Sequence, residues 1–299
     1  MKKLGAFFII LTILMGSCAC SAMGEQIQVI VSFYPIYILS MNVFEGIDDI
    51  ILSSMTAPDT GCLHDYQLLT KDMMKLSDAD AFIVCGAGME AYLPDIEKQF
   101  PDLPLIDCST GIDLIANEHH DEDVDEEESE YNAHTWLDVQ NAIQIVHTIA
   151  ADSSELFPEY SDILNANARA YIARLQALDA ELRQMLLPVQ GEKIVTFHEA
   201  FPYFANAYGL EIAAVISEEH ENTLSPAKLS EVIESVKAAG VPPLFTEPQY
   251  SAAAAFAVAA ETGAKIYTLD PLASGAYDQN AYENGMLENA ASILQAFEE

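Results

Sequence analysis

Four side chains that can bind a metal ion lie where a predicted strand ends or a predicted helix begins. They are three histidines and one aspartate: His64, His134, His198 and Asp270. Such positions gather ligands in α/β folds, because the carboxyl ends of parallel strands meet at one edge of a sheet. Three neutral imidazoles and one carboxylate suit a borderline divalent ion such as Zn²⁺. A single loop histidine is more often solvated or hydrogen-bonded to backbone, so the prediction of a metal site depends on the whole set.

Three further side chains are secondary candidates. Glu247 follows a predicted strand, so it either orients a ligand imidazole or is an exposed carboxylate at the strand end. His119 and His120 belong to the segment 118–130, which has nine acidic residues and almost no apolar ones. Such a segment cannot pack into a core and predicts a mobile loop. The loop either concentrates cations near the metal site or is a merely solvated run of charge.

The elements that must position these residues follow an alternation of short β-branched runs and helical patterns. This alternation predicts parallel sheets connected by helices. Four strands are predicted in the first half of the chain: Gln28–Phe33, Ile50–Met55, Ala81–Cys85 and Pro104–Cys108. Four more are predicted in the second half: Lys193–Phe197, Glu211–Ile216, Pro243–Thr246 and Lys265–Leu269. We therefore expect an α/β fold with two lobes, each built on a four-stranded, mainly parallel sheet flanked by helices.

A long helical pattern at residues 158–187 separates the two sets of strands, with no interior glycine or proline. It predicts one helix of about 28 residues, roughly 42 Å long, which is a rigid connector that limits hinge motion. The predicted domains are a leader (1–24), a first metal-binding lobe (25–157), the linker helix (158–187) and a second metal-binding lobe (188–299). Two of the histidines then belong to the first lobe, and the third histidine and the aspartate to the second. This division predicts a metal site in a cleft between the lobes.

The first 24 residues have the layout of an export signal. Two lysines precede an apolar run that is too short to span a bilayer comfortably. The stretch 14–18 resembles a bacterial lipobox, so we expect Cys18 to become the lipidated N-terminus. The alternatives are an ordinary secretory cleavage near Ala22 and lipidation at Cys20. No later run reaches transmembrane length, so we expect an extracytoplasmic protein attached to the bacterial cell membrane by a lipid anchor only.

Charge and cysteine content narrow the classes of function. The net charge of −35 at pH 7 repels nucleic acid and attracts cations, so nucleic-acid binding is excluded. Cys62, Cys85 and Cys108 remain in the body of the chain, and their spacing matches no structural zinc motif. At most one intramolecular disulfide could form among them. Cys85 and Cys108 are expected to be small buried residues at strand ends.

Five short motifs occur along the chain. They are His-Asp-Tyr at 64–66, Asn-Ala-His-Thr-Trp-Leu-Asp at 132–138, Phe-His-Glu-Ala-Phe-Pro-Tyr-Phe at 197–204, Phe-Thr-Glu-Pro-Gln at 245–249 and Leu-Asp-Pro-Leu at 269–272. With these motifs around a long helix, the chain resembles the zinc- and manganese-specific solute-binding proteins of ABC importers over essentially its whole length. The resemblance implies His64, His134 and His198 as nitrogen ligands, and Asp270 as a carboxylate ligand or a residue close to the ion. It also implies partners, namely a membrane permease and its ATPase subunit, to which a monomeric binding protein delivers its metal.

His198 is the position that distinguishes the two branches of that family. Zinc-type members carry His there, whereas manganese-type members typically carry Glu, a harder ligand. We therefore predict Zn²⁺ capture, with capture of Mn²⁺ or iron, or a metal-binding surface adhesin, as alternatives. Two departures from the family pattern, Ala133 and Val139 where Pro is common, remove no ligand. An enzyme is not predicted, because His-Glu-x-x-His and nucleophile motifs are absent. Since imidazole must be neutral to bind, the affinity is expected to fall steeply below about pH 6.

Overall fold

The computed structural model describes residues 26–64, 66–117, 129–216, 225–249 and 252–298. The predicted lipidation site Cys18 and the histidines His119 and His120 lie outside these residues. Ala116 and Tyr131, which flank the acidic segment 118–130, form an antiparallel bridge. Within the described part of the chain, every helix is too short or too polar to cross a membrane.

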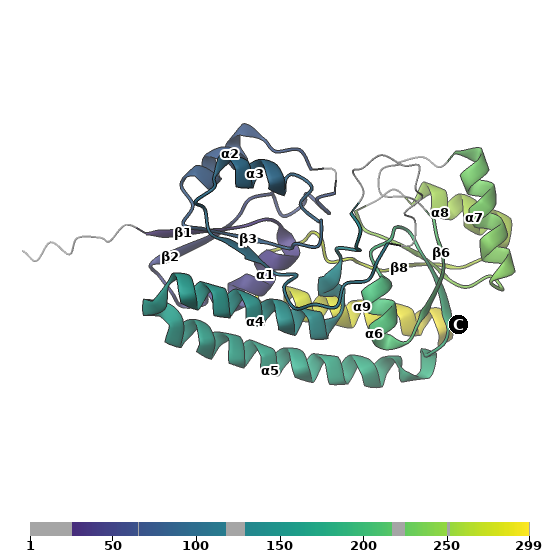
Figure 1. Ribbon diagram of the computed structural model, residues 1–299. Coiled ribbons are helices and arrows are strands. Elements are labelled where there is room, and N and C mark those ends of the chain that lie inside the picture. Colours follow the sequence, from purple (N-terminus) through teal and green to yellow (C-terminus); the bar gives the residue numbers. More distant parts are fainter. Residues whose placement is uncertain (1–25, 65, 118–128, 217–224, 250–251, 299) are drawn as a thin grey trace, which may run out of the picture.

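Two parallel sheets of four strands each form the centre of the molecule (Figure 1). The first has the order β2-β1-β3-β4 and consists of β1 (Ile27–Val31), β2 (Ile50–Ser54), β3 (Ala81–Val84) and β4 (Leu105–Asp107). The second has the order β6-β5-β7-β8 and consists of β5 (Lys193–Thr196), β6 (Glu211–Val215), β7 (Leu244–Thr246) and β8 (Ile266–Thr268). The two sheets share one strand order, and all eight predicted strands begin and end within two residues of those observed. The predicted fold class is confirmed.

The helices connect successive strands or pack along the sheets. The first half of the chain contains α1 (Tyr34–Val43), α2 (Thr70–Ser77), α3 (Leu93–Gln99) and α4 (Val139–Leu156). The second half contains α6 (Pro202–Tyr208), α7 (Pro226–Ala238), α8 (Ala253–Thr262) and α9 (Ala281–Glu298). Each parallel strand pair requires such a crossover, because a tight turn cannot join parallel neighbours.

The predicted long helix is α5 (Ser161–Leu186), which has a short 3₁₀ turn at each end, Pro158–Tyr160 and Leu187–Val189. Figure 1 shows α5 running below both sheets, alongside α4 and α9. Its buried face repeats at helical spacing and consists mainly of Leu164, Ala168, Tyr171, Leu175, Leu178, Leu182 and Leu186. Arg174, on the more exposed side of α5, donates hydrogen bonds to Asn42 on α1 and to Glu283 on α9. The helix is therefore held along its length by both halves of the chain.

The main hydrophobic core extends across both lobes. It contains strands of the first sheet, the inner faces of α4, α5 and α9, and residues of the second lobe such as Ile194, Phe201 and Phe204. A smaller cluster lies within the second lobe around Val195, Val236 and Leu244. The two lobes therefore share one core, and a closely packed core resists deformation. The residue numbers predicted for the lobe boundaries, 157/158 and 187/188, stay a prediction.

Candidate metal centre

His134 lies in a loop that leads into α4 and is only 1% exposed. The motif residue Asp138 caps that helix, because its Oδ1 accepts the backbone N–H of Gln140 at 2.8 Å. Asn132 Oδ1 accepts both the backbone N–H of His134 at 3.0 Å and its ring Nδ1–H at 3.2 Å. The amide Nδ2 of Asn132 donates to Glu199 O at 2.6 Å, which is consistent with Oδ1 facing the ring. Nδ1 therefore carries the proton, and the lone pair of His134 lies on Nε2.

The electrostatic surroundings keep His134 neutral. Burial lowers the pKa of His134 well below its usual value, and the neighbouring His64 and His198 lower it further. A protonated imidazole would be costly in this position because it would be desolvated beside two other imidazoles. His134 is therefore ready to bind a cation at neutral pH.

His198 follows β5 and lies just before α6, with 1% of its surface exposed. Glu247, the first residue after β7, is 3% exposed and accepts the Nδ1–H of His198 through Oε1 at 2.6 Å. The same oxygen accepts the backbone N–H of His198 at 3.2 Å. Burial lowers the pKa of His198, but the Glu247 carboxylate and Cys62 more than offset that effect, so the pKa lies well above the ordinary value. Of the two interpretations of Glu247, the structure favours the one in which it orients an imidazole.

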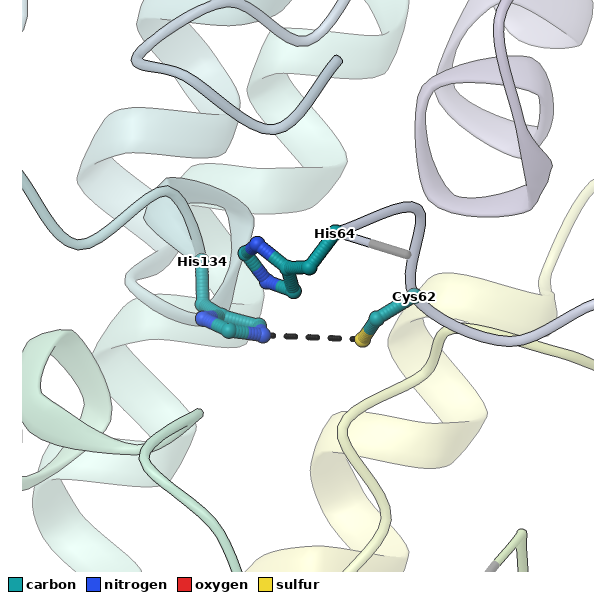
Figure 2. Close-up of side chains that lie close together, drawn as sticks. All are labelled: Cys62, His64 and His134. Carbon is teal, nitrogen blue, oxygen red and sulfur yellow. Dashed lines mark hydrogen bonds between the residues drawn. The ribbon is translucent and has the colours of Figure 1, made fainter. Parts of the chain in front are cut away.

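The three predicted histidines come together at one point between the lobes. His134 is central, with 5.2 Å between its ring centroid and those of both His64 and His198. The Nε2 atoms of His134 and His198 are 3.4 Å apart. Figure 2 shows the His64 ring, from the loop after β2, beside the His134 ring. Two nitrogens bound to one tetrahedral zinc at the usual bond length lie about 3.4 Å apart, so the pair fits a shared ion.

Cys62 is a member of the cluster that the sequence analysis did not identify. In the described part of the chain, Cys62, His64 and His134 form a group whose potential ligand atoms all lie within 4.8 Å of one another (Figure 2). The Sγ atom of Cys62 is 3.5 Å from Nε2 of His134. In the sequence, the indication that Cys62 could lie at the site was its position two residues before His64 in the same loop. Cys85 and Cys108 are fully buried after β3 and β4, as expected, and both are free thiols.

Asp270 lies after β8 and is half-buried. Its Oδ1 accepts a hydrogen bond from the Gln249 side chain at 3.0 Å and from the backbone N–H of Leu272 at 2.9 Å. Asn289 on α9 holds the Asp270 backbone through two further hydrogen bonds. These contacts stabilise the turn into Pro271, and Asp270 is not part of the Cys62–His64–His134 group among the residues described. Its role as a ligand stays a prediction.

The loop around His134 is tied to the second lobe. Trp136 Nε1 donates to Pro271 O at 2.7 Å, and Tyr282 OH donates to Trp136 O at 2.7 Å. Tyr203 OH donates to Asn132 O at 2.9 Å. Trp136 and the aromatic residues of α6 and the turn before it are buried, as expected of side chains that pack beneath the site. The position of His134 is thus set by residues from both lobes.

The sequence is similar to those of known zinc-uptake and zinc-binding proteins. The family model described as zinc-uptake complex component A, periplasmic (ZnuA), matches residues 29–296. The zinc-binding protein AdcA of Streptococcus pyogenes is 27% identical over 265 residues, which cover 83% of this chain and 50% of AdcA, so the chain spans about half the length of that relative. The high-affinity zinc uptake system protein ZnuA of Brucella abortus is 26% identical over 340 residues, which cover 99% of this chain and 98% of the relative.

Solved structures show the same fold. A crystal structure of ZnuA superposes with a TM-score of 0.77 at 29% identity and covers 91% of this chain and 99% of its own. Zn(II)-bound AdcA from Streptococcus pneumoniae gives a TM-score of 0.77 at 27% identity and covers 92% of this chain and 58% of its own. FpvC from Pseudomonas aeruginosa with Mn²⁺ gives 0.82 at 24% identity, covers 92% of this chain and 99% of its own, and shows the fold alone. Because the family model extends over both lobes and every histidine of the cluster, the chain belongs to the ZnuA family of zinc-uptake components.

Proposed function

We propose that this protein captures Zn²⁺ at the junction of its two lobes and delivers it to the permease and ATPase of an ABC importer. One observation carries the proposal. His134 and His198 come from different lobes, each has its Nδ1–H engaged by an oxygen acceptor, and their Nε2 atoms are 3.4 Å apart. Outer hydrogen bonds of this kind fix the tautomer and the ring orientation of metal-binding histidines.

The proposed ligands are His64, His134 and His198, with Asp270 as a carboxylate ligand or a residue close to the ion. Glu247 is proposed to orient His198 and to balance part of the positive charge of the ion. The enclosed position of His134 and His198 supports tight binding, because burial lowers the local dielectric and strengthens interactions with the ion.

The choice of zinc over manganese follows from the donor atoms. A site rich in imidazole suits zinc, whereas manganese prefers oxygen ligands. AdcA and ZnuA are described as zinc-binding and zinc-uptake proteins, which supports the same choice. Capture of Mn²⁺ or iron remains the alternative, and FpvC structures with Mn²⁺ and Ni²⁺ show that the fold accepts other ions.

A surface adhesin is a second alternative. The laminin-binding protein Lmb of Streptococcus agalactiae, described as having adhesin and metal-transporting activity, has a TM-score of 0.75 at 26% identity and covers 90% of this chain and 99% of its own. The family relationship favours transport as the function of this chain, and we infer no catalytic activity.

We infer that the protein works outside the cytoplasm as a monomer, attached to the membrane through lipidated Cys18. The periplasmic family supports the location, and the lipobox at 14–18 supports the anchor. The acidic segment with His119 and His120 is proposed to concentrate cations, because the residues that flank it, Ala116 and Tyr131, pair directly before the His134 loop. Release of the ion is proposed to involve small movements of the loops around His64 or His198, since the lobes share one core.

Metal content and competition test the proposal on the chain from Glu25 onward, purified without a His tag. We expect one tightly bound zinc per chain, lost in His198→Ala and not displaced by excess Mn²⁺. His147→Ala is the matched control, because His147 lies exposed on α4 and its loss should leave zinc binding unchanged. Failure to bind zinc tightly, or preferential retention of Mn²⁺, would overturn the proposal.

A further inference from the structure

The thiol of Cys62 has surroundings different from those of the other two described cysteines. Cys85 and Cys108 are fully buried, and the Cys85 thiol contacts the carbonyl oxygen of Ala133 at 3.6 Å. Cys62 is half-buried in the loop that carries His64, and its Sγ lies 3.5 Å from His134 Nε2. Cys62 is also close enough to His198 to raise the pKa of that imidazole. The Cys62 thiol is therefore near two of the three imidazoles of the metal centre, and Figure 2 shows its sulfur beside the His134 ring.

The distances around His134 match a tetrahedral zinc that has one sulfur ligand. With a Zn–S bond of about 2.3 Å and a Zn–N bond of about 2.05 Å, tetrahedral geometry places sulfur about 3.6 Å from nitrogen and two nitrogens about 3.4 Å apart. The structure has 3.5 Å from Cys62 Sγ to His134 Nε2 and 3.4 Å from that nitrogen to His198 Nε2. Each of these two pairs of atoms is therefore spaced as binding to a shared ion requires.

Asp270 is the competing candidate for the fourth position. Its Oδ1 already accepts two hydrogen bonds that hold the turn after β8, from Gln249 and Leu272. The Cys62 thiol, by contrast, lies in one group with His64 and His134, whose potential ligand atoms are all within 4.8 Å of one another. These contacts favour sulfur over the carboxylate as the partner of the imidazoles.

We propose that Cys62 is a metal ligand, so that the site binds its ion through three imidazoles and one thiolate. The inference rests on the proposed function and specifies its chemistry. On binding, the S–H bond of Cys62 breaks, the proton passes to solvent, and a metal–sulfur bond forms without any change in oxidation state. A thiolate is a softer ligand than a carboxylate, so the site selects Zn²⁺, Co²⁺ and other borderline or soft ions and rejects Mn²⁺ and Mg²⁺.

Co²⁺ is the probe for the test, because a cobalt–thiolate bond produces a charge-transfer absorption band in the near ultraviolet. The protein from Glu25 onward is loaded with one equivalent of Co²⁺, and its spectrum is compared with those of Cys62→Ser, Cys62→Ala and, as a thiol control away from the site, Cys108→Ala. We expect the band in the parent protein and in the Cys108 variant, and its loss in both Cys62 variants. We also expect the Cys62 variants to lose zinc affinity by more than about 100-fold. Removal of a residue that only hydrogen-bonds a ligand costs up to about 100-fold, and loss of a ligand itself should cost more.

A second measurement uses the unmutated protein, so it does not depend on folding of the variants. Alkylation of Cys62 by iodoacetamide, followed by mass spectrometry, should be blocked by one equivalent of Zn²⁺. The inference would be overturned if the protein bound one Co²⁺ without a charge-transfer band and zinc left the alkylation of Cys62 unchanged. The proposed function would still stand in that case. Absence of tight binding of either ion to the parent protein would overturn both.

Discussion

Replacement of Glu247 by Gln tests how the second lobe prepares His198 for metal binding. The Glu247 and His198 side chains are 0% and 1% exposed, and Oε1 accepts both the ring Nδ1–H at 2.6 Å and the backbone N–H at 3.2 Å. Gln preserves the shape and an acceptor oxygen but removes the negative charge. Loss of such an outer partner lowers metal affinity by roughly 10- to 100-fold, which corresponds to about 1.4–2.7 kcal/mol.

The size of that loss should depend on pH in a defined direction. Although burial lowers the pKa of His198, Glu247 and Cys62 raise it well above the ordinary value, so a proton competes with zinc for His198. Gln lowers this pKa and weakens the competition. The full loss of affinity is therefore expected in alkaline solution, and a smaller loss is expected at acidic pH, where the proton competes most strongly in the parent protein.

The assay is competition for zinc against a chromophoric chelator in alkaline and in acidic solution. Glu234→Gln is the matched control, since Glu234 is an exposed residue of α7 whose partner is Lys237. An affinity of Glu247→Gln within about twofold of the parent at both pH values would refute the reasoning, because an outer partner should contribute at least tenfold. A loss that grows as the pH falls would refute the assignment of the proton to His198.

Three further outcomes are expected. In the parent protein, zinc affinity should fall as the pH drops through the raised pKa of His198, so titration should show the loss beginning above the pH of about 6 expected for unperturbed imidazoles. Burial raises the pKa of Glu90 from 4.5 to about 7. The protonated Glu90 therefore stabilises the metal-free protein below pH 4.5, and this stabilisation is lost as the pH rises through about 7. The free energy of unfolding, measured with urea, should fall by about 3 kcal/mol over this range. The Glu90→Gln variant should show no such decline. Small-angle scattering should show no large compaction when zinc is added, because α5 and the shared core join the lobes; a large compaction would contradict the stiff connection.

Local patterns in the sequence determined most of the fold. The eight strands are short, mostly apolar runs, and α5 has an apolar face at helical spacing, so both depend on the pattern within one segment. The positions of His64, His134 and His198 at the ends of elements also followed from local order. Parallel strand ends meet at one edge, which is why residues so far apart in sequence were expected to converge.

Only the tertiary structure decided which other side chains lie beside the three histidines. Glu247 had two interpretations in the sequence, and its contact with His198, 49 residues away, depends on the pairing of β7 with β5. Cys62 gave no periodic signal, because it lies in an irregular loop whose direction is set by packing against the His134 loop, 72 residues further along the chain. Asp270 was as plausible as the histidines by position, yet its carboxylate holds a turn. The position of a residue at a strand end predicts where its backbone lies. The loop conformation and the packing of the two lobes decide where its ligand atom lies.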